Sequence, residues 1–226
     1  MDNPNLEDIK NNPGKDPIDE LKKSIAVYNK ELAITSVEEL IIGKVNPLII
    51  IETMTGVMKL IGNAYENDEL FLPDLIGASD TMSSVMPLVE EEIKKSGQKI
   101  KSLGIVVLGT VLGDVHSIGK QMVGTMLQAE GFTVHDIGID VSAEKFINAI
   151  KIYDADILAM SALLTTTAFE QKKVISTLVK EGLREKIKIM VGGGAVTEDF
   201  AKSIGADGYD PTAPGAAKLA RKLIEK

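Results

Sequence analysis

The first part of the chain has the apolar spacing of amphipathic helices. Within residues 18–95, apolar side chains recur at intervals of three and four positions, as in Leu21, Ile25, Tyr28 and Leu32. A helix with this spacing places its apolar side chains on one face. The region is therefore predicted to be helical, with one buried face on each helix.

Interruptions in the periodicity divide this region into separate helices. They lie at residues 35–36, 43–47 and 67–73, and Ser36 followed by Glu39 resembles the capping box that starts a helix. About four helices result. The pattern predicts a small four-helix bundle.

From residue 103 the pattern changes to short runs of β-type residues, each followed by a helical stretch. The predicted strands read LGIVVLG, TVHDIG, DILAMS, KIMVGG and DGYD. The predicted helices cover residues 118–130, 142–153, 167–182, 197–204 and 213–225. Because parallel strands need crossover connections, five such units predict a five-stranded parallel sheet with helices on both faces. The expected fold class is α/β, with a flavodoxin-like (Rossmann-like) domain after the helical bundle.

These patterns give an expected domain organisation. A leader covers residues 1–17, the helical domain 18–95, a linker 96–102, and the α/β domain 103–226. The charges change at the same place: residues 1–97 hold 9 Lys/Arg against 18 Asp/Glu, a net of −9, and the rest holds 16 against 15, a net of +1. An acidic helical domain is expected to precede a nearly neutral one.

Composition excludes several classes of function. The net charge of −8 and the lack of a basic stripe argue against nucleic acid and anionic membranes as partners. The longest apolar stretches are too short to span a bilayer, and the polar start has no signal-peptide pattern, so a cytoplasmic location is expected. With no cysteine, the chain has neither disulfides nor thiolate chemistry.

The segment GTVLGDVHSIGKQMVG, residues 109–124, contains the strongest candidate for chemistry. His116 follows the first predicted strand, and ligands of such sheets bind beyond the carboxyl ends of the strands. In an extended segment Asp114 and His116 project to the same side. A carboxylate bonded to one imidazole nitrogen leaves the other for a metal or a proton. The alternative is that Asp114 only caps the next helix and His116 is an incidental loop residue.

Four motifs in order resemble one family. GDVHSIG resembles a D-x-H-x-x-G signature, SALLTTT an S-x-L segment, VGGGAVT a G-G turn, and AYENDELFLPDL a stretch of a helical cap. The resemblance covers residues from about 18 to 226, with these motifs in the right order along the chain. The chain resembles the corrinoid (cobalamin-binding) methyltransferase subunits, and is similar to the cap and cobalamin-binding domains of cobalamin-dependent methionine synthase.

The resemblance implies how cobalamin binds. His116 would replace the cofactor's own dimethylbenzimidazole as the lower axial ligand of cobalt, and the displaced nucleotide tail would run into the α/β domain. Thr167 would hydrogen-bond Asp114, and Ser161 the benzimidazole. Tyr65 and Leu72 would shield the upper face of the cobalt. The full set of expected cofactor-binding residues is Tyr65, Leu72, Asp114, His116, Ser117, Ile118, Gly119, Ser161, Leu163, Thr165, Thr167, Gly192, Gly193 and Gly194.

At three positions the sequence differs from the usual residues of the family, and some of the expected residues have alternative structural roles. Ser117 stands where many relatives carry Asp, Gly194 replaces a usual Ala, and Tyr65 takes the place of a Phe. Ser161 and the threonines could instead be ordinary helix caps, and Tyr65 and Leu72 could be bundle core.

The sequence also predicts the roles of two glycines, the second histidine and four methionines. Gly119 and Gly193 are expected to leave space for the macrocycle or its tail, so that Val at either would block the ligand and spare the fold. His135 is expected to be structural. Four methionines at helical spacing, Met54, Met58, Met82 and Met86, are expected in the core.

The resemblance also implies the role of the protein. Cobalt(I) accepts a methyl group from a donor, giving methylcobalamin as an intermediate, and passes the methyl group to an acceptor. The chain shows no residue set for the donor chemistry, so it is predicted to be a methyl carrier that does not catalyse transfer alone.

The carrier role implies several partners. A donor-specific methyltransferase would act on a methoxylated aromatic, a methylamine, methanol or betaine, and an acceptor-side methyltransferase would serve tetrahydrofolate or a thiol. A corrinoid reductive activator is a third expected partner. The alternative function is that of a cobalamin-dependent sensor or regulator. A third possibility, the cobalamin domain of a radical mutase, is disfavoured because that domain would account for the α/β part of the chain but not for the helical domain.

Overall fold

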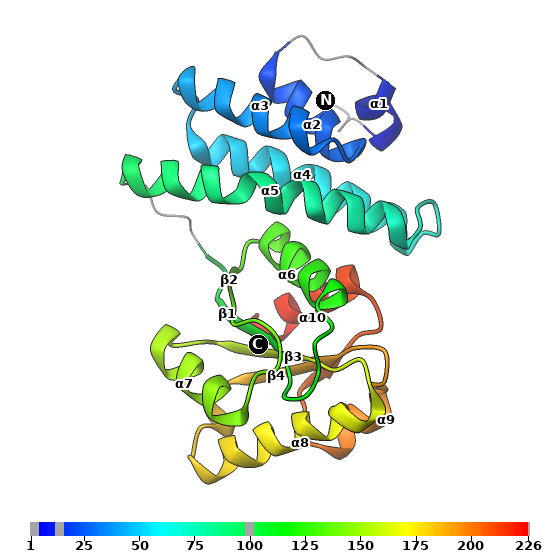
Figure 1. The fold of residues 1–226 in the computed structure, drawn as a ribbon, viewed down its shortest axis with the longest axis vertical. Coiled ribbons are helices and arrows are strands. Elements are labelled where there is room, and N and C mark those ends of the chain that lie inside the picture. The colour runs from blue at the N-terminus through cyan, green and yellow to red at the C-terminus, as the bar shows by residue number, and fades with distance from the viewer. Residues whose placement is uncertain (1–4, 12–15, 98–101, 226) are drawn as a thin grey trace. The chain divides into compact units, whose positions relative to one another are not determined.

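The chain forms two compact units, Met1–Lys101 and Ser102–Lys226 (Figure 1). The computed structural model describes residues 5–11, 16–97 and 102–225. The predicted linker, residues 96–102, falls mostly on positions 98–101, which lie outside the described residues. Its first residue, Ser96, is the last residue of a helix.

The first unit is helical, as predicted. Its helices are α1 Leu6–Asn11, α2 Pro17–Ala26, α3 Lys30–Ile42, α4 Pro47–Glu66 and α5 Leu72–Ser96. The four longer helices form the predicted bundle. The short helix α1 lies inside the stretch that was expected to be a loose leader. A single buried apolar residue, Ile9, gives no periodicity that a sequence pattern could detect.

The predicted helix break at residues 35–36 is wrong. Helix α3 runs through it, and the hydroxyl of Ser36 donates to the carbonyl of Leu32 at 2.8 Å inside the helix. The chain breaks earlier, where Tyr28 adopts a left-handed φ of 62° and the side chain of Asn29 accepts a hydrogen bond from the amide of Leu32 at 3.0 Å. Asn is a strong N-cap residue, so Asn29 starts the helix.

Tyr28 also links this break to α5. A Cβ added at Gly77 would lie 2.8 Å from Cγ of Tyr28, so the ring packs directly on the glycine. The Tyr28 hydroxyl donates to Oδ1 of Asp74 at 3.2 Å. Burial, followed by the charge and the hydrogen bond of Asp74, raises the pKa of Tyr28 to about 12.

The core of the helical unit is apolar side chains from its long helices. The four methionines predicted to be core residues are all buried, and Met54, Met58 and Met82 have no exposed surface. Unbranched Met side chains fill irregular gaps between helices. Among the described residues no helix is long and apolar enough to cross a membrane.

The second unit is a parallel α/β fold, which confirms the predicted class. Its strands are β1 Ile105–Thr110, β2 Thr133–Asp136, β3 Ile157–Ser161, β4 Lys188–Gly192 and β5 Gly208–Tyr209. Its α-helices are α6 Ile118–Glu130, α7 Ala143–Tyr153, α8 Thr165–Lys180, α9 Glu198–Ser203 and α10 Ala213–Ile224. The strand order is β2-β1-β3-β4-β5, the order of flavodoxin-like folds.

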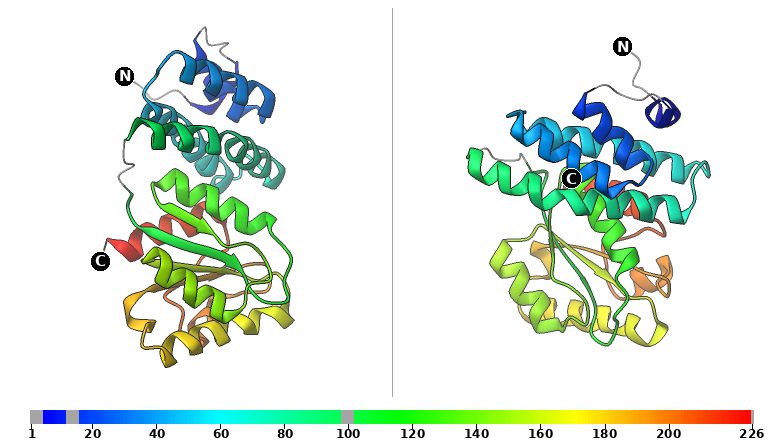
Figure 2. Two further views of the ribbon diagram at one scale, coloured as in Figure 1. Left: turned by 60° about the vertical axis from the view of Figure 1, so that its left-hand side comes forward. Right: turned by 45° about the horizontal axis from the view of Figure 1, so that its top comes forward.

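Helices cover both faces of this sheet (Figure 2). Side chains of α7 and α8, among them Phe146, Ile150, Ile175 and Leu178, form one core cluster with the strands. Helices α6 and α10 lie on the opposite face (Figure 1). The chain leaves β1 toward one face and enters β3 from the other, so the carboxyl ends of these two strands form the switch point where ligands bind.

Candidate functional site

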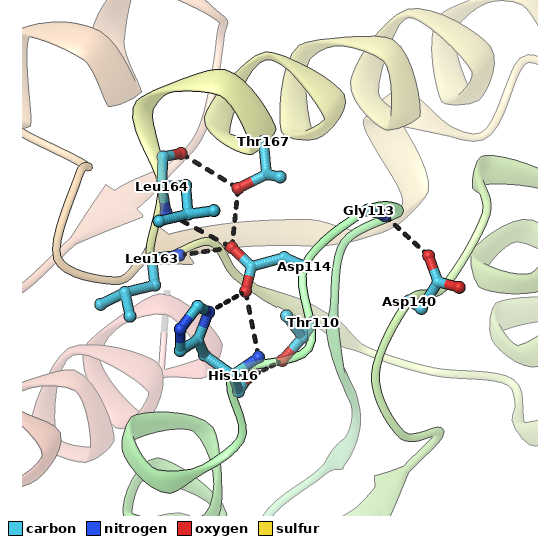
Figure 3. Close-up of polar contacts among 8 residues, drawn as sticks. All are labelled: Thr110, Gly113, Asp114, His116, Asp140, Leu163, Leu164 and Thr167. Carbon is cyan, nitrogen blue, oxygen red and sulfur yellow. Dashed lines mark hydrogen bonds and ion pairs between the residues drawn. The ribbon is translucent and has the colours of Figure 1, made fainter.

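The loop between β1 and α6 lies at this switch point and is held from two sides (Figure 3). The hydroxyl of Thr110, which is fully buried at the end of β1, donates to the carbonyl of His116 at 2.9 Å. The amide of Gly113, at φ 79°, donates to Oδ1 of Asp140 at 2.7 Å, and the amide of Asp140 donates back to the carbonyl of Asp114 at 3.0 Å. These contacts fix the loop before any ligand binds.

Thr110 and Asp140 were not predicted as site residues. Thr110 is a polar residue at the end of an apolar strand, which is a weak signal in the sequence. Asp140 belongs to the loop after β2, and only the tertiary fold brings it to Gly113.

Asp114 and His116 form the hydrogen bond that their spacing predicts. The two side chains meet at 2.7 Å, between Oδ1 of Asp114 and Nδ1 of His116, and the same oxygen accepts from the His116 amide at 3.1 Å (Figure 3). An ionised carboxylate can only accept hydrogen bonds, so Nδ1 of His116 carries the proton. In the neutral ring, Nε2 then keeps its lone pair.

The other oxygen of Asp114 is bound by the start of α8. Oδ2 accepts from the hydroxyl of Thr167 at 2.7 Å and from the amide of Leu163 at 2.8 Å. The predicted contact between Thr167 and Asp114 is therefore present (Figure 3). Although burial alone would raise the pKa of Asp114, the hydrogen bonds from Thr167, His116 and Leu163 outweigh burial and hold this pKa well below its usual range.

Asp114 and His116 differ in their exposure to solvent. The Asp114 side chain has no exposed surface, while 47% of the His116 side chain is exposed. The carboxylate thus remains charged in the protein interior because it is fully hydrogen-bonded. The ring that it orients can bond a metal or a proton from outside the protein.

Large exposed apolar residues flank His116 in its loop and also occur in the turn after β3. Val115 and Ile118 on either side of His116 are 66% and 59% exposed, and Leu112 and Leu163 are each 43% exposed. Exposed apolar residues gathered at the mouth of a fold mark a surface that a ligand or partner covers. Ile118 and Leu163, both predicted site residues, belong to this rim.

The glycines of the site differ from one another. Gly119 is the second residue of α6, and a Cβ added there would meet no atom within 4 Å. A Cβ at Gly194 would lie 2.8 Å from Cδ1 of Leu163, so the turns after β3 and β4 touch. Gly192 ends β4, and an added Cβ there also meets nothing within 4 Å.

The expectation for Gly193 needs correction. Its φ is 114°, and an added Cβ would lie 2.1 Å from the carbonyl oxygen of Ala162. A side chain there conflicts with the protein backbone before any ligand is involved. Val at Gly193 therefore disturbs the fold, and only Gly119 gives a clean test of space kept for a ligand.

The remaining predicted residues of this unit lie at the same edge of the sheet. Ser117 is the N-cap residue of α6, but its side chain makes no capping hydrogen bond. Ser161 is the last residue of β3, and Thr165 is the exposed first residue of α8. The fold therefore brings all twelve predicted residues of the α/β unit to the carboxyl ends of β1, β3 and β4.

Tyr65 and Leu72 belong to the helical unit. Tyr65 is half-buried near the end of α4, and Leu72 is the 49% exposed first residue of α5. Amides of the connecting turn bond back to the carbonyl of Ala64, which keeps the two residues at the same turn. Leu72 is thus not bundle core, and the adjacent Phe71, which was not predicted, is 70% exposed.

His135, the second histidine, lies on the edge strand β2. Its ring stacks on Tyr153 with centroids 3.7 Å apart and planes at 9°. The contact fits the structural role expected for His135.

The donor set at the carboxyl edge fits a corrinoid. An exposed imidazole with Nδ1 engaged and Nε2 open suits a metal that needs one axial nitrogen. The apolar rim suits a large macrocycle, and the bare backbone at Gly119 allows it to approach closely. No second metal ligand from the chain is needed, because the macrocycle supplies the other nitrogens.

Comparisons with known proteins agree with this fit. Residues 104–218 match the family described as "B12 binding domain", and residues 17–90 match a second family with the same description. The chain is 41% identical to dimethylamine corrinoid protein 2 of Methanosarcina acetivorans over 92% of this chain and 95% of that protein. It is 38% identical to trimethylamine corrinoid protein 1 of the same organism, over 90% and 94%.

A solved structure agrees over nearly the whole chain. The methanol:cobalamin methyltransferase complex MtaBC of Methanosarcina barkeri aligns with a TM-score of 0.80 at 30% identity, covering 97% of this chain and 83% of that one. The cofactor is cobalamin, and the chain belongs to the family of corrinoid methyltransferase subunits.

Proposed function

We propose that this chain carries methyl groups taken from a methylated amine, with His116 as the lower axial ligand of its cobalamin. The carrier role itself follows from the family, whose members are corrinoid proteins of methyltransferase systems. Bound cobalamin supplies a cobalt centre that accepts a methyl group and gives it up again. The observation that carries the ligand assignment is the exposed His116 ring with Nδ1 held by a buried carboxylate.

The residues of the chain have distinct tasks in this proposal. Asp114 holds the proton on Nδ1 of His116, so that Nε2 faces outward as an electron-pair donor. Thr167 and the amide of Leu163 keep Asp114 ionised and in place. The exposed apolar residues near His116 would exclude water from the bond between His116 and the bound cofactor.

The donor class is supported by the comparisons and decided by a partner protein. Sequence identity is 41% and 38% to the dimethylamine and trimethylamine corrinoid proteins, and among the solved structures it is 33% to the monomethylamine corrinoid protein of Methanosarcina barkeri and 30% to the chain aligned in the methanol complex. A donor-specific methyltransferase would load the cofactor, and an acceptor-side methyltransferase would unload it toward a folate or a thiol. A reductive activator would restore cobalt(I) after oxidation, and all three partners would meet the chain in the cytoplasm.

Methylation by matched partners tests the donor. The reduced, cobalamin-loaded protein is incubated with methyltransferases specific for dimethylamine, trimethylamine or methanol and the matching substrate, and methylation is followed by cobalamin absorbance. We expect the highest kcat/KM with one of the amine enzymes. Faster methylation by the methanol enzyme would contradict the proposal.

A further inference from the structure

Gln171 is a polar side chain with no exposed surface on the inner face of α8. Its Nε2 donates to the carbonyl oxygen of Met160 at 3.1 Å and to that of Gly192 at 3.2 Å. Met160 belongs to β3 and Gly192 ends β4. One amide group therefore ties together the ends of two neighbouring strands.

Gln171 is the counterpart of Thr167 on the same helix. The two residues are four positions apart, so they lie on one face of α8. Thr167 holds Asp114, which orients His116, whereas Gln171 holds Gly192. Helix α8 thus holds the loop of Asp114 and His116 through Thr167, and it holds the glycine turn after β4 through Gln171.

The glycine turn has little freedom to adjust. The carbonyl of Gly192 also accepts from the amide of Ala162 at 3.0 Å, and Gly193 leaves no room for a Cβ against the backbone of Ala162. Gln171 adds a second donor to the same Gly192 carbonyl. The position of this turn therefore depends on the side chain of Gln171.

The oxygen of this amide, Oε1, has no hydrogen-bond donor among the described residues. Oε1 of Gln171 is buried and accepts no hydrogen bond from any residue that the structure describes. In an amide group this oxygen lies about 2.2 Å from the nitrogen, so it is next to the ends of β3 and β4. A buried acceptor without a donor costs free energy, which a donor from a ligand would recover.

We propose that Gln171 makes the site select a corrinoid that has its nucleotide tail. Nε2 holds the turn of Gly192 and Gly193, and Oε1 accepts a hydrogen bond from a ribose hydroxyl of the tail. Of the three parts of the nucleotide, only the ribose has donors, because the benzimidazole and the phosphodiester can only accept. The inference rests on the proposed ligation by His116, because that ligation displaces the nucleotide tail of the cofactor, which the resemblance implies runs into the α/β unit.

Cobinamide, which has the corrin ring but lacks the nucleotide, provides the test. Affinities for cobalamin and cobinamide are measured by absorbance titration for the wild type, Gln171→Met and Gln121→Met. By analogy with the outer partners of metal ligands, we expect Gln171→Met to weaken cobalamin binding about 10- to 100-fold and cobinamide binding less than about twofold. Gln121 is an exposed residue of α6, so its variant should change neither affinity.

The outcomes separate this inference from the proposed function. If the wild type binds both corrinoids equally, the protein does not bind the nucleotide tail and the role of Gln171 is overturned, whereas the proposed ligation by His116 is tested separately by its spectrum. If the wild type prefers cobalamin and Gln171→Met keeps the preference, only the role of Gln171 is overturned. Equal weakening of both corrinoids would also overturn it, because it would show a general structural role.

A measurement on the wild type covers the case in which Gln171→Met does not fold. The chain has four glutamines, so the side-chain amide signals can be resolved in a spectrum of protein labelled with ¹⁵N at glutamine. The Gln171 signal should shift on binding of diamagnetic cyanocobalamin and shift much less with dicyanocobinamide. Equal shifts with both corrinoids would contradict the proposal.

Discussion

Two acids, the buried Asp114 of the α/β unit and the partly buried Asp74 of the helical unit, make similar contacts with different consequences. Each binds a ring side chain with Oδ1 and the start of a helical segment with Oδ2: Asp114 holds His116 and the amide of Leu163, and Asp74 holds Tyr28 and the amide of Phe71. Asp74 lies at the third position of α5 and closes a contact within its own bundle.

The two acids differ in whether the ring that they hold has a second polar atom available for another contact. The Tyr28 hydroxyl uses its one proton on Asp74, so the contact ends there. The His116 ring uses Nδ1 on Asp114 and presents a second nitrogen on a side chain that is 47% exposed. A ring held by a carboxylate can also bind a ligand when it has a second polar atom and the fold leaves that atom accessible.

The largest expected effect comes from Gly119. Because a Cβ at Gly119 would meet no described atom within 4 Å, Gly119→Val should leave the fold intact and abolish detectable cobalamin binding. Circular dichroism and a cobalamin titration measure the two properties. Gly56, an exposed glycine of α4 with equally open space, provides the matched control Gly56→Val, which should bind normally. Normal binding by Gly119→Val would show that the macrocycle does not approach α6.

Asp114→Asn should have the next largest effect. An amide at this position can keep the shape of the site but no longer stabilises the proton on Nδ1 of His116, so affinity for cobalamin should fall about 10- to 100-fold. Isothermal titration with aquocobalamin measures the loss. Asp74→Asn, the same change in the helical unit, should leave the absorption spectrum of the bound cobalamin unchanged. Equal spectral changes in both variants would show that the two acids do not differ in their effect on ligation by His116.

Tyr28→Phe should have the smallest effect, and one that depends on pH. The folded-state pKa of Tyr28, about 12, lies above its ordinary value of 10.0, so its contribution to stability is present below about pH 10 and is lost as the pH rises toward 12. Removing the hydroxyl should cost about 1 kcal/mol at neutral pH. Urea unfolding monitored by circular dichroism at pH 7, 10 and 11.5 should show the difference between wild type and variant shrinking as the pH rises. A difference that grows with pH would contradict the assignment.

Regular patterns made much of the fold predictable. The five strand and helix units follow from alternating short apolar runs and amphipathic stretches, and the observed bounds lie within a few residues of those predicted. The spacing of Asp114 and His116 also predicted their contact, because two residues separated by one in an extended segment share a side.

Contacts between distant segments could not be predicted. Asp140 gains its role only when the loops after β1 and β2 meet, and Gln171 of α8 gains its role only when β3 and β4 lie side by side. Lys120 would be expected at the surface, yet its side chain is only 3% exposed and its ammonium group pairs with Asp136 from β2. Similarly, nothing local in the sequence shows that Gly193 abuts Ala162 while Gly119 is open.

If Nε2 of His116 is the lower axial ligand of the cobalt, the nitrogen of this ring must couple to the unpaired electron of cobalt(II). Electron paramagnetic resonance of the cobalamin-loaded protein in the cobalt(II) state is recorded for protein labelled with ¹⁵N at its two histidines, for unlabelled protein, and for His116→Ala. With His116 as the ligand, we expect a nitrogen coupling that changes from the ¹⁴N to the ¹⁵N pattern with labelling and is absent in His116→Ala, whereas His135→Ala retains it. A ¹⁵N-sensitive coupling that survives in His116→Ala, or a coupling in the wild type that labelling leaves unchanged, would contradict the account.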